Sequence, residues 1–134
     1  MAKKTKESEY VLRIYHHLDE RTNTKGVMFA VETVEIFTNF RYDILLEDRR
    51  NKSEIELKIV GLHAPAMLMP GKGPARGTRE YHNLKGTYTV RVKKMEKETN
   101  EFIVHITLDR IIVKNVSENP FIISRVDPLK ITTV

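Results

Sequence analysis

The 134-residue chain contains no cysteine and no tryptophan, and aromatic residues make up only 7% of it. The missing cysteines exclude disulfide scaffolds, cysteine-ligated zinc, iron–sulfur clusters and thiol nucleophiles. No apolar run approaches the length that a bilayer-spanning segment needs. Residues 1–8 are polar and basic, and no apolar secretory stretch follows them. We therefore interpret 1–8 as a polar leader and expect a cytoplasmic protein.

Amphipathic helices are missing as well, because no window of a dozen residues shows apolar positions at spacings of three and four. Instead, apolar and polar residues alternate, which is the period of a half-buried strand. The alternation is clearest over 40–59 and over 88–108, and a polar break interrupts each stretch. The pattern predicts two antiparallel hairpins.

The register of each predicted hairpin follows from keeping its apolar residues on one face. In the first hairpin this requirement places Ile44 opposite Leu57. In the second hairpin it places Val90 opposite Val104, with His105 facing outward. Cross-strand charge pairs on the outer faces favour both registers.

Shorter apolar segments predict further strands, which gives seven or eight in all. Over 27–37 the apolar positions change parity, and this change predicts a β-bulge or a bend near Glu32 and Thr33. Closely spaced strands without long crossovers favour antiparallel pairing. Strands with one apolar face must stack in two layers or close on themselves. We expect a single all-β domain over 9–134, an antiparallel β-sandwich, with a barrel as the alternative.

The segment 82–90, with the sequence HNLKGTYTV, carries a family resemblance. It resembles the beginning of a strand in immunoglobulin-like and prealbumin-like domains, in which a leucine and a glycine precede a Tyr-x-Val strand. The resemblance implies a sandwich and carries no function, because many folds of this class have unrelated activities.

Residues 63–83 hold three of the five prolines and three of the six glycines, and they predict a long surface loop. The glycine spacing does not match a nucleotide-binding phosphate loop. The apolar run 67–69 within it predicts a plug for one end of the core or a contact with another subunit. The cations and histidines of this segment form a candidate anion-binding set: Lys72, Arg76, Arg79, His63 and His82.

The net charge of +5 permits binding to nucleic acid or other polyanions, but the cations are scattered along the chain. No catalytic residues, metal site or cofactor are predicted, because no histidine, carboxylate or serine pattern has the spacing that such chemistry requires. Apolar residues at outward-facing positions such as Leu45, Val60 and Ile103 favour a covered surface.

The leading hypothesis is therefore a non-catalytic interaction or assembly module of unknown biological role. Its partner would be another protein or a second copy of the chain, in a homo-oligomer, and no membrane is involved. The alternatives are an anion- or nucleic-acid-binding domain that uses basic loops and, after it, an enzyme of unknown class.

Overall fold

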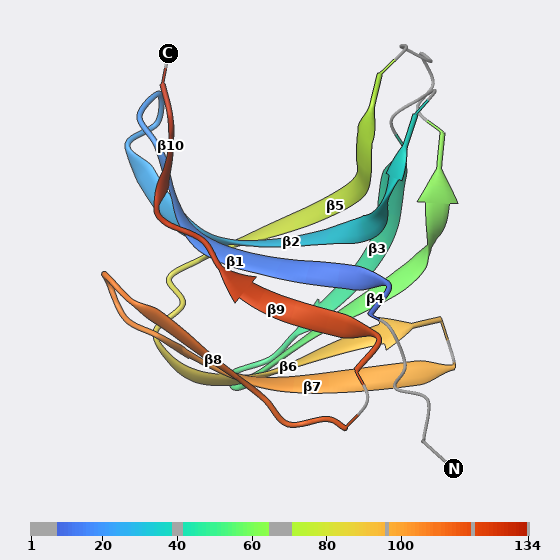
Figure 1. The fold of residues 1–134 in the computed structure, drawn as a ribbon. Coiled ribbons are helices and arrows are strands. Elements are labelled where there is room, and N and C mark those ends of the chain that lie inside the picture. Colours follow the sequence, from blue (N-terminus) through green and yellow to red (C-terminus); the bar gives the residue numbers. More distant parts are fainter. Residues whose placement is uncertain (1–7, 39–41, 65–70, 96, 119, 134) are drawn as a thin grey trace.

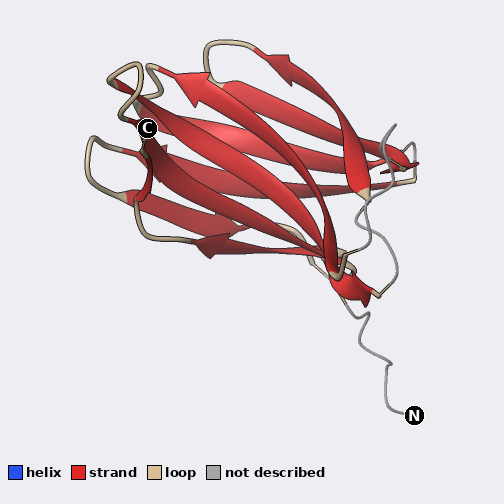
Figure 2. Ribbon diagram, turned by 90° about the horizontal axis from the view of Figure 1, so that it is seen from above, coloured by secondary structure: helices blue, strands red, loops and turns tan. Residues whose placement is uncertain are grey.

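A computed structural model describes residues 8–38, 42–64, 71–95, 97–118 and 120–133, and all regular structure in these ranges is strand (Figures 1 and 2). The strands are β1 (Tyr10–Asp19), β2 (Thr24–Phe37), β3 (Asp43–Arg50), β4 (Glu54–His63), β5 (Gly73–His82), β6 (Gly86–Lys94), β7 (Glu98–Ile106), β8 (Ile111–Asn115), β9 (Ile122–Val126) and β10 (Lys130–Thr132). The all-β prediction is confirmed, although the described residues form ten strands where seven or eight were expected.

The strands form one mixed sheet in the order β10-β1-β2-β5-β3-β4-β6-β7-β8, and β9 pairs with β1 beside β10. Strands β8 and β9 lie close together without a hydrogen-bonded ladder between them, so the sheet is barrel-shaped and nearly closed. The barrel, which was the alternative expectation, fits this arrangement, and the expected sandwich does not. The exclusively antiparallel pairing was wrong, because β1–β9, β1–β10, β3–β5 and β4–β6 are parallel.

Two layers face each other within this barrel (Figure 1). One contains β1, β2, β5, β9 and β10, and the other contains β3, β4, β6, β7 and β8. A single residue pair, Asp43 with Arg76, joins β3 to β5. Strands β1 to β9 all contribute to the apolar core between the layers, whose largest fully buried side chains include Phe29, Phe102 and Phe121.

Both predicted hairpins exist, but their registers were wrong. In the first, Ile44 lies opposite Leu62 instead of Leu57, and the register shifts again between Leu45 and Leu46. The side chain of Asn51 accepts hydrogen bonds from the amides of Ser53 (3.1 Å) and Glu54 (2.9 Å). With this side-chain turn, β3 continues to Arg50 through residues that the pattern assigned to the polar break, and β4 begins at Glu54.

In the second hairpin, Val90 lies opposite Phe102 instead of Val104. A shift of two residues leaves every side chain on its face, so the apolar pattern cannot detect it. His105 is exposed as expected, and its Nδ1 lies 2.8 Å from the Thr87 hydroxyl.

The predicted bulge in β2 is confirmed, because the β2–β5 register shifts between Glu32 and Ile36. The predicted loop over 63–83 was wrong for about half of its length, since β5 spans Gly73–His82 and pairs with β2 along nearly all of it. The apolar run 67–69 and the leader residues 1–7 lie outside the described residues.

Candidate functional site

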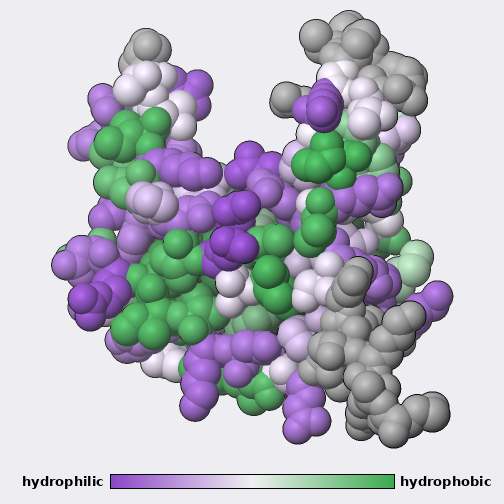
Figure 3. Space-filling model, viewed as in Figure 1, coloured by the Kyte–Doolittle hydropathy of each residue, from purple (hydrophilic) through white to green (hydrophobic). Residues whose placement is uncertain are grey.

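A polar hollow lies on the outer face of β1, β2, β5 and β10, between two projections of the molecule (Figure 3). Glu32 accepts from Arg13 at 3.0 Å and pairs with Arg76 at 3.2 Å. Arg13 also pairs with Asp127 at 3.2 Å, and Arg76 donates to the hydroxyl of the buried Tyr15 at 2.8 Å. These charges already pair with one another within the chain. They therefore stabilise the sheet and are not free to bind a ligand.

A second group in the hollow centres on Glu80. His17 Nδ1 lies 2.5 Å from Glu80 Oε2, and His17 Nε2 lies 2.7 Å from the Thr132 hydroxyl. His82 Nε2 lies 3.7 Å from the other Glu80 oxygen. Gly26 leaves room for this arrangement, since a Cβ there would lie 3.0 Å from Glu80 Cγ. The contacts connect β1, β5 and β10 across a glycine of β2.

The structure does not bring the predicted anion-binding residues together. Arg76 and His82 both face the hollow, but they lie six positions apart along β5, or about 20 Å. His63 ends β4 opposite Asp43, and Lys72 precedes β5. The anion site stays a prediction that no shared geometry supports.

Arg79, the fifth member of that set, connects β5 to β3. Its guanidinium contacts Asp48 Oδ1 at 3.1 Å and the Leu46 carbonyl at 2.5 Å. The Tyr81 hydroxyl donates to Asp48 Oδ2 at 2.7 Å. This hydrogen bond and Arg79 lower the pKa of Asp48, whereas burial, reinforced by Asp48, raises the pKa of Tyr81. The group joins two strands that share only one ladder pair.

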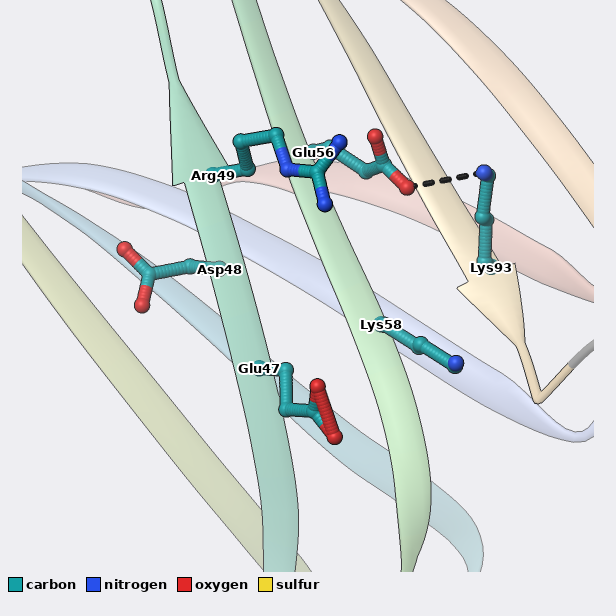
Figure 4. Close-up of a pocket in the computed structure, with 6 residues that line it drawn as sticks. All are labelled: Glu47, Asp48, Arg49, Glu56, Lys58 and Lys93. Atoms are coloured by element: carbon teal, nitrogen blue, oxygen red, sulfur yellow. Dashed lines mark ion pairs between the residues drawn. The ribbon is translucent and has the colours of Figure 1, made fainter.

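A shallow hollow of about 200 Å³ lies on the outer face of β3, β4 and β6 (Figure 4). Glu56 and Lys93 point toward each other and pair at 2.8 Å, and this contact lowers the pKa of Glu56. Acidic and basic groups alternate around it, which is typical of a solvated sheet face. The lining residues are Glu47, Asp48, Arg49, Glu56, Lys58 and Lys93.

Apolar side chains gather on one side of the molecule, over the end of β9 and the turn before β8 (Figure 3). We name this surface the apolar flank and define it by Leu108, Val126, Leu129 and Ile131, which are 78%, 46%, 49% and 51% exposed. It lies where the barrel does not close. Single exposed apolar residues are ordinary, but a cluster of this kind marks a contact surface.

Two hollows of about 130 and 250 Å³ open beside the apolar flank, and they share His16, Lys25 and Leu108. Lys25 Nζ donates to the Leu108 carbonyl at 2.6 Å. His16 Nε2 is buried and has no hydrogen-bond partner among the described residues. Burial lowers the pKa of His16, and the nearby Lys25 charge lowers it further. The backbone of Thr107 and Arg110, which approaches the ring but forms no regular hydrogen bond with Nε2, and the Asp109 charge raise the pKa in opposition. The imidazole is therefore neutral at neutral pH.

The lowered pKa of His16 predicts a pH-dependent contribution to stability. As the pH falls below about 6.5, an unfolded histidine binds a proton that folded His16 resists, so folding loses stability. A His16→Gln variant lacks this loss. When the pH falls from about 7.5 to about 5, we expect the variant to become more stable relative to the wild type, as measured by the free energy of unfolding in urea titrations. An unchanged difference would contradict the assignment.

A scan against protein-family models and searches of curated proteins and of solved structures found no match. Within the described ranges, no group of three or more histidine, aspartate or glutamate side chains is arranged to hold a metal ion. The described part of the chain also has no helix long and apolar enough to cross a membrane. Of the surfaces above, the apolar flank and its hollows are the ones whose groups are not already satisfied internally.

Proposed function

We propose that the protein is a non-catalytic assembly module that associates with a second copy of itself through the apolar flank. The observation that carries the proposal is the exposure of four large apolar side chains at the one side where the sheet does not close. Covering them would remove apolar area from water, which is the main driving force of protein association.

The charges around the apolar flank suit a second copy. Lys25 and Asp109 both line the larger hollow. In a two-fold arrangement, the same patch meets itself, so Lys25 of one copy can approach Asp109 of the other. A surface of one sign would repel its own copy.

The free strand edges at this side offer a second kind of contact. Among the described residues, β9 and β10 each pair only with β1, so their outer edges carry backbone groups without a ladder partner. Such edges readily accept another strand. By contrast, Arg76 and Arg79, which the anion-binding alternative requires, contact carboxylates of their own chain.

The expected association is weak. A fully buried leucine or valine contributes about 1.5–3 kcal/mol, and the apolar flank has four such residues that are already partly covered. Association itself costs at least about 4 kcal/mol, which offsets much of this gain, and we expect a dissociation constant between about 10 μM and 1 mM.

The proposal is tested by light scattering and sedimentation equilibrium up to about 1 mM protein. The wild type should form dimers in that range, and Leu129→Glu or Ile131→Glu should raise the dissociation constant at least about tenfold by burying an unpaired charge. Leu45→Glu is the matched control, because Leu45 is 45% exposed on β3, outside the apolar flank. A strictly monomeric wild type, or an equal effect of the control, would overturn the proposal.

A further inference from the structure

The larger hollow beside the apolar flank has the size and lining of a small-molecule site. Its volume is about 250 Å³, and Leu108, Ile111, Val126 and Leu129 give it apolar walls. A cavity of roughly 150 Å³ already accommodates benzene, so one aromatic ring fits with room for a substituent. An apolar lining with a few polar groups is the usual composition of such sites.

The polar groups of the hollow select the kind of substituent. Lys25 and Asp109 line the same hollow with opposite charges. An anionic ligand would be attracted by Lys25 but repelled by Asp109, and a cationic ligand would meet the reverse. A neutral hydroxyl accepts from an ammonium group and donates to a carboxylate at once, so it suits both.

His16 adds a third reason for a hydroxyl. It belongs to the wall that both hollows share, and its buried Nε2 lacks a partner among the described residues. Leaving a buried polar atom unpaired is costly, and a ligand that pairs with it recovers that cost. With its proton donated to Asp109, the hydroxyl oxygen still accepts a hydrogen bond from the ring in its Nε2–H tautomer.

We propose that this hollow binds a small, neutral, aromatic molecule that carries one hydroxyl, of which phenol is the simplest example. The ring packs on the leucine, isoleucine and valine side chains, and the hydroxyl lies between Lys25 and Asp109. This binding goes beyond self-association and does not depend on it.

The experiment uses the full chain with Ile131→Glu, because Ile131 is part of the apolar flank but does not line the hollow. The variant therefore keeps the site open whether or not the wild type dimerises. Phenol is titrated to about 20 mM and followed by backbone amide NMR shifts, with toluene and benzoate as ligands that lack the neutral hydroxyl. We expect saturable shifts around Lys25, Leu108 and Val126, and phenol affinity at least about tenfold above either comparison ligand.

Two variants test the polar contacts. Lys25→Met should reduce the affinity for phenol to that for toluene, whereas Lys52→Met, an exposed lysine in the β3–β4 turn, should leave it unchanged. Asp109→Asn should raise the affinity for benzoate by removing a negative charge. The proposal is overturned by an absence of saturable phenol shifts, by shifts elsewhere on the chain, by equal binding of toluene, or by a Lys25→Met variant that binds phenol normally.

Discussion

Replacing Phe121 with alanine is expected to lower the free energy of unfolding by about 3–5 kcal/mol. The side chain is fully buried and meets the Tyr10 ring edge-on, with 6.2 Å between ring centroids. Its loss would leave a cavity beneath β9, the strand that carries one border of the apolar flank. A truncation that leaves a cavity costs more than the lost transfer free energy alone.

The backbone amide and carbonyl of Phe121 also hydrogen-bond to residues of other strands, so this position is a junction between them. Its amide donates to Asn100 Oδ1 at 2.9 Å, and its carbonyl accepts from the amides of Glu9 (2.8 Å) and Tyr10 (3.2 Å). Asn100 is the one buried polar residue in the described part of the chain. The junction therefore holds β7, the start of β1 and the start of β9 together.

Urea unfolding followed by far-ultraviolet dichroism measures the expected loss. Ile112→Ala on the neighbouring strand β8 is the control, because Ile112 is 51% exposed and its truncation should change stability by no more than about 0.5 kcal/mol. A Phe121→Ala loss below about 1 kcal/mol would show that β9 does not depend on this anchor. The variant should also weaken self-association, since β9 carries Val126 of the apolar flank.

How far the sequence predicts this fold depends on the range of the interactions involved. Alternation of apolar residues is local, and it identified both hairpins and the change of face in β2. Register across a hairpin depends on the turn, and the short turn at Asn51 moved Ile44 to a partner five residues beyond the predicted one. The parallel pairing of β4 with β6 brings together strands separated by all of β5, and no local pattern encodes it.

Strand β5 was missed for a different reason. Its alternate positions carry Ala75, Gly77, Arg79 and Tyr81, so no run of large apolar residues marks its inner face. Proline and glycine near its start are typical of a loop. Small residues are needed on this face because β3 packs directly against it. This contact is long-range, so the sequence alone does not indicate it.

The candidate site was also beyond the sequence. Two of the predicted cations contact carboxylates that the fold brings close, Arg76 with Glu32 and Arg79 with Asp48. Exposed apolar residues were expected, but positions such as Leu108 and Leu129, which lie in short polar segments, give no periodic signal.

 Leu129, for example, lies between two short strands, and only the unclosed side of the barrel shows that it shares a hollow with Leu108.

The close approach of β3 to β5 leads to the second large effect, at Gly77. A Cβ at this position would lie 2.5 Å from the Ile44 carbonyl oxygen, which is a backbone atom of β3 and cannot rotate away. Alanine therefore forces the two strands apart at the point where the layers join. Such overpacking costs about 1–3 kcal/mol, and we expect Gly77→Ala to lie at the upper end because Leu46 Cγ is also only 3.1 Å away.

Gly61→Ala provides a control, because alanine at this position should not lower the free energy of unfolding. Gly61 lies in β4, and a Cβ there would meet no atom within 4 Å, so the substitution reduces only the freedom of the unfolded chain. We expect its unfolding free energy to stay unchanged or to rise by up to about 1 kcal/mol in the same urea titration. If Gly77→Ala were as stable as Gly61→Ala, β3 could not lie against β5 as described, and the junction of the two layers would need a different arrangement.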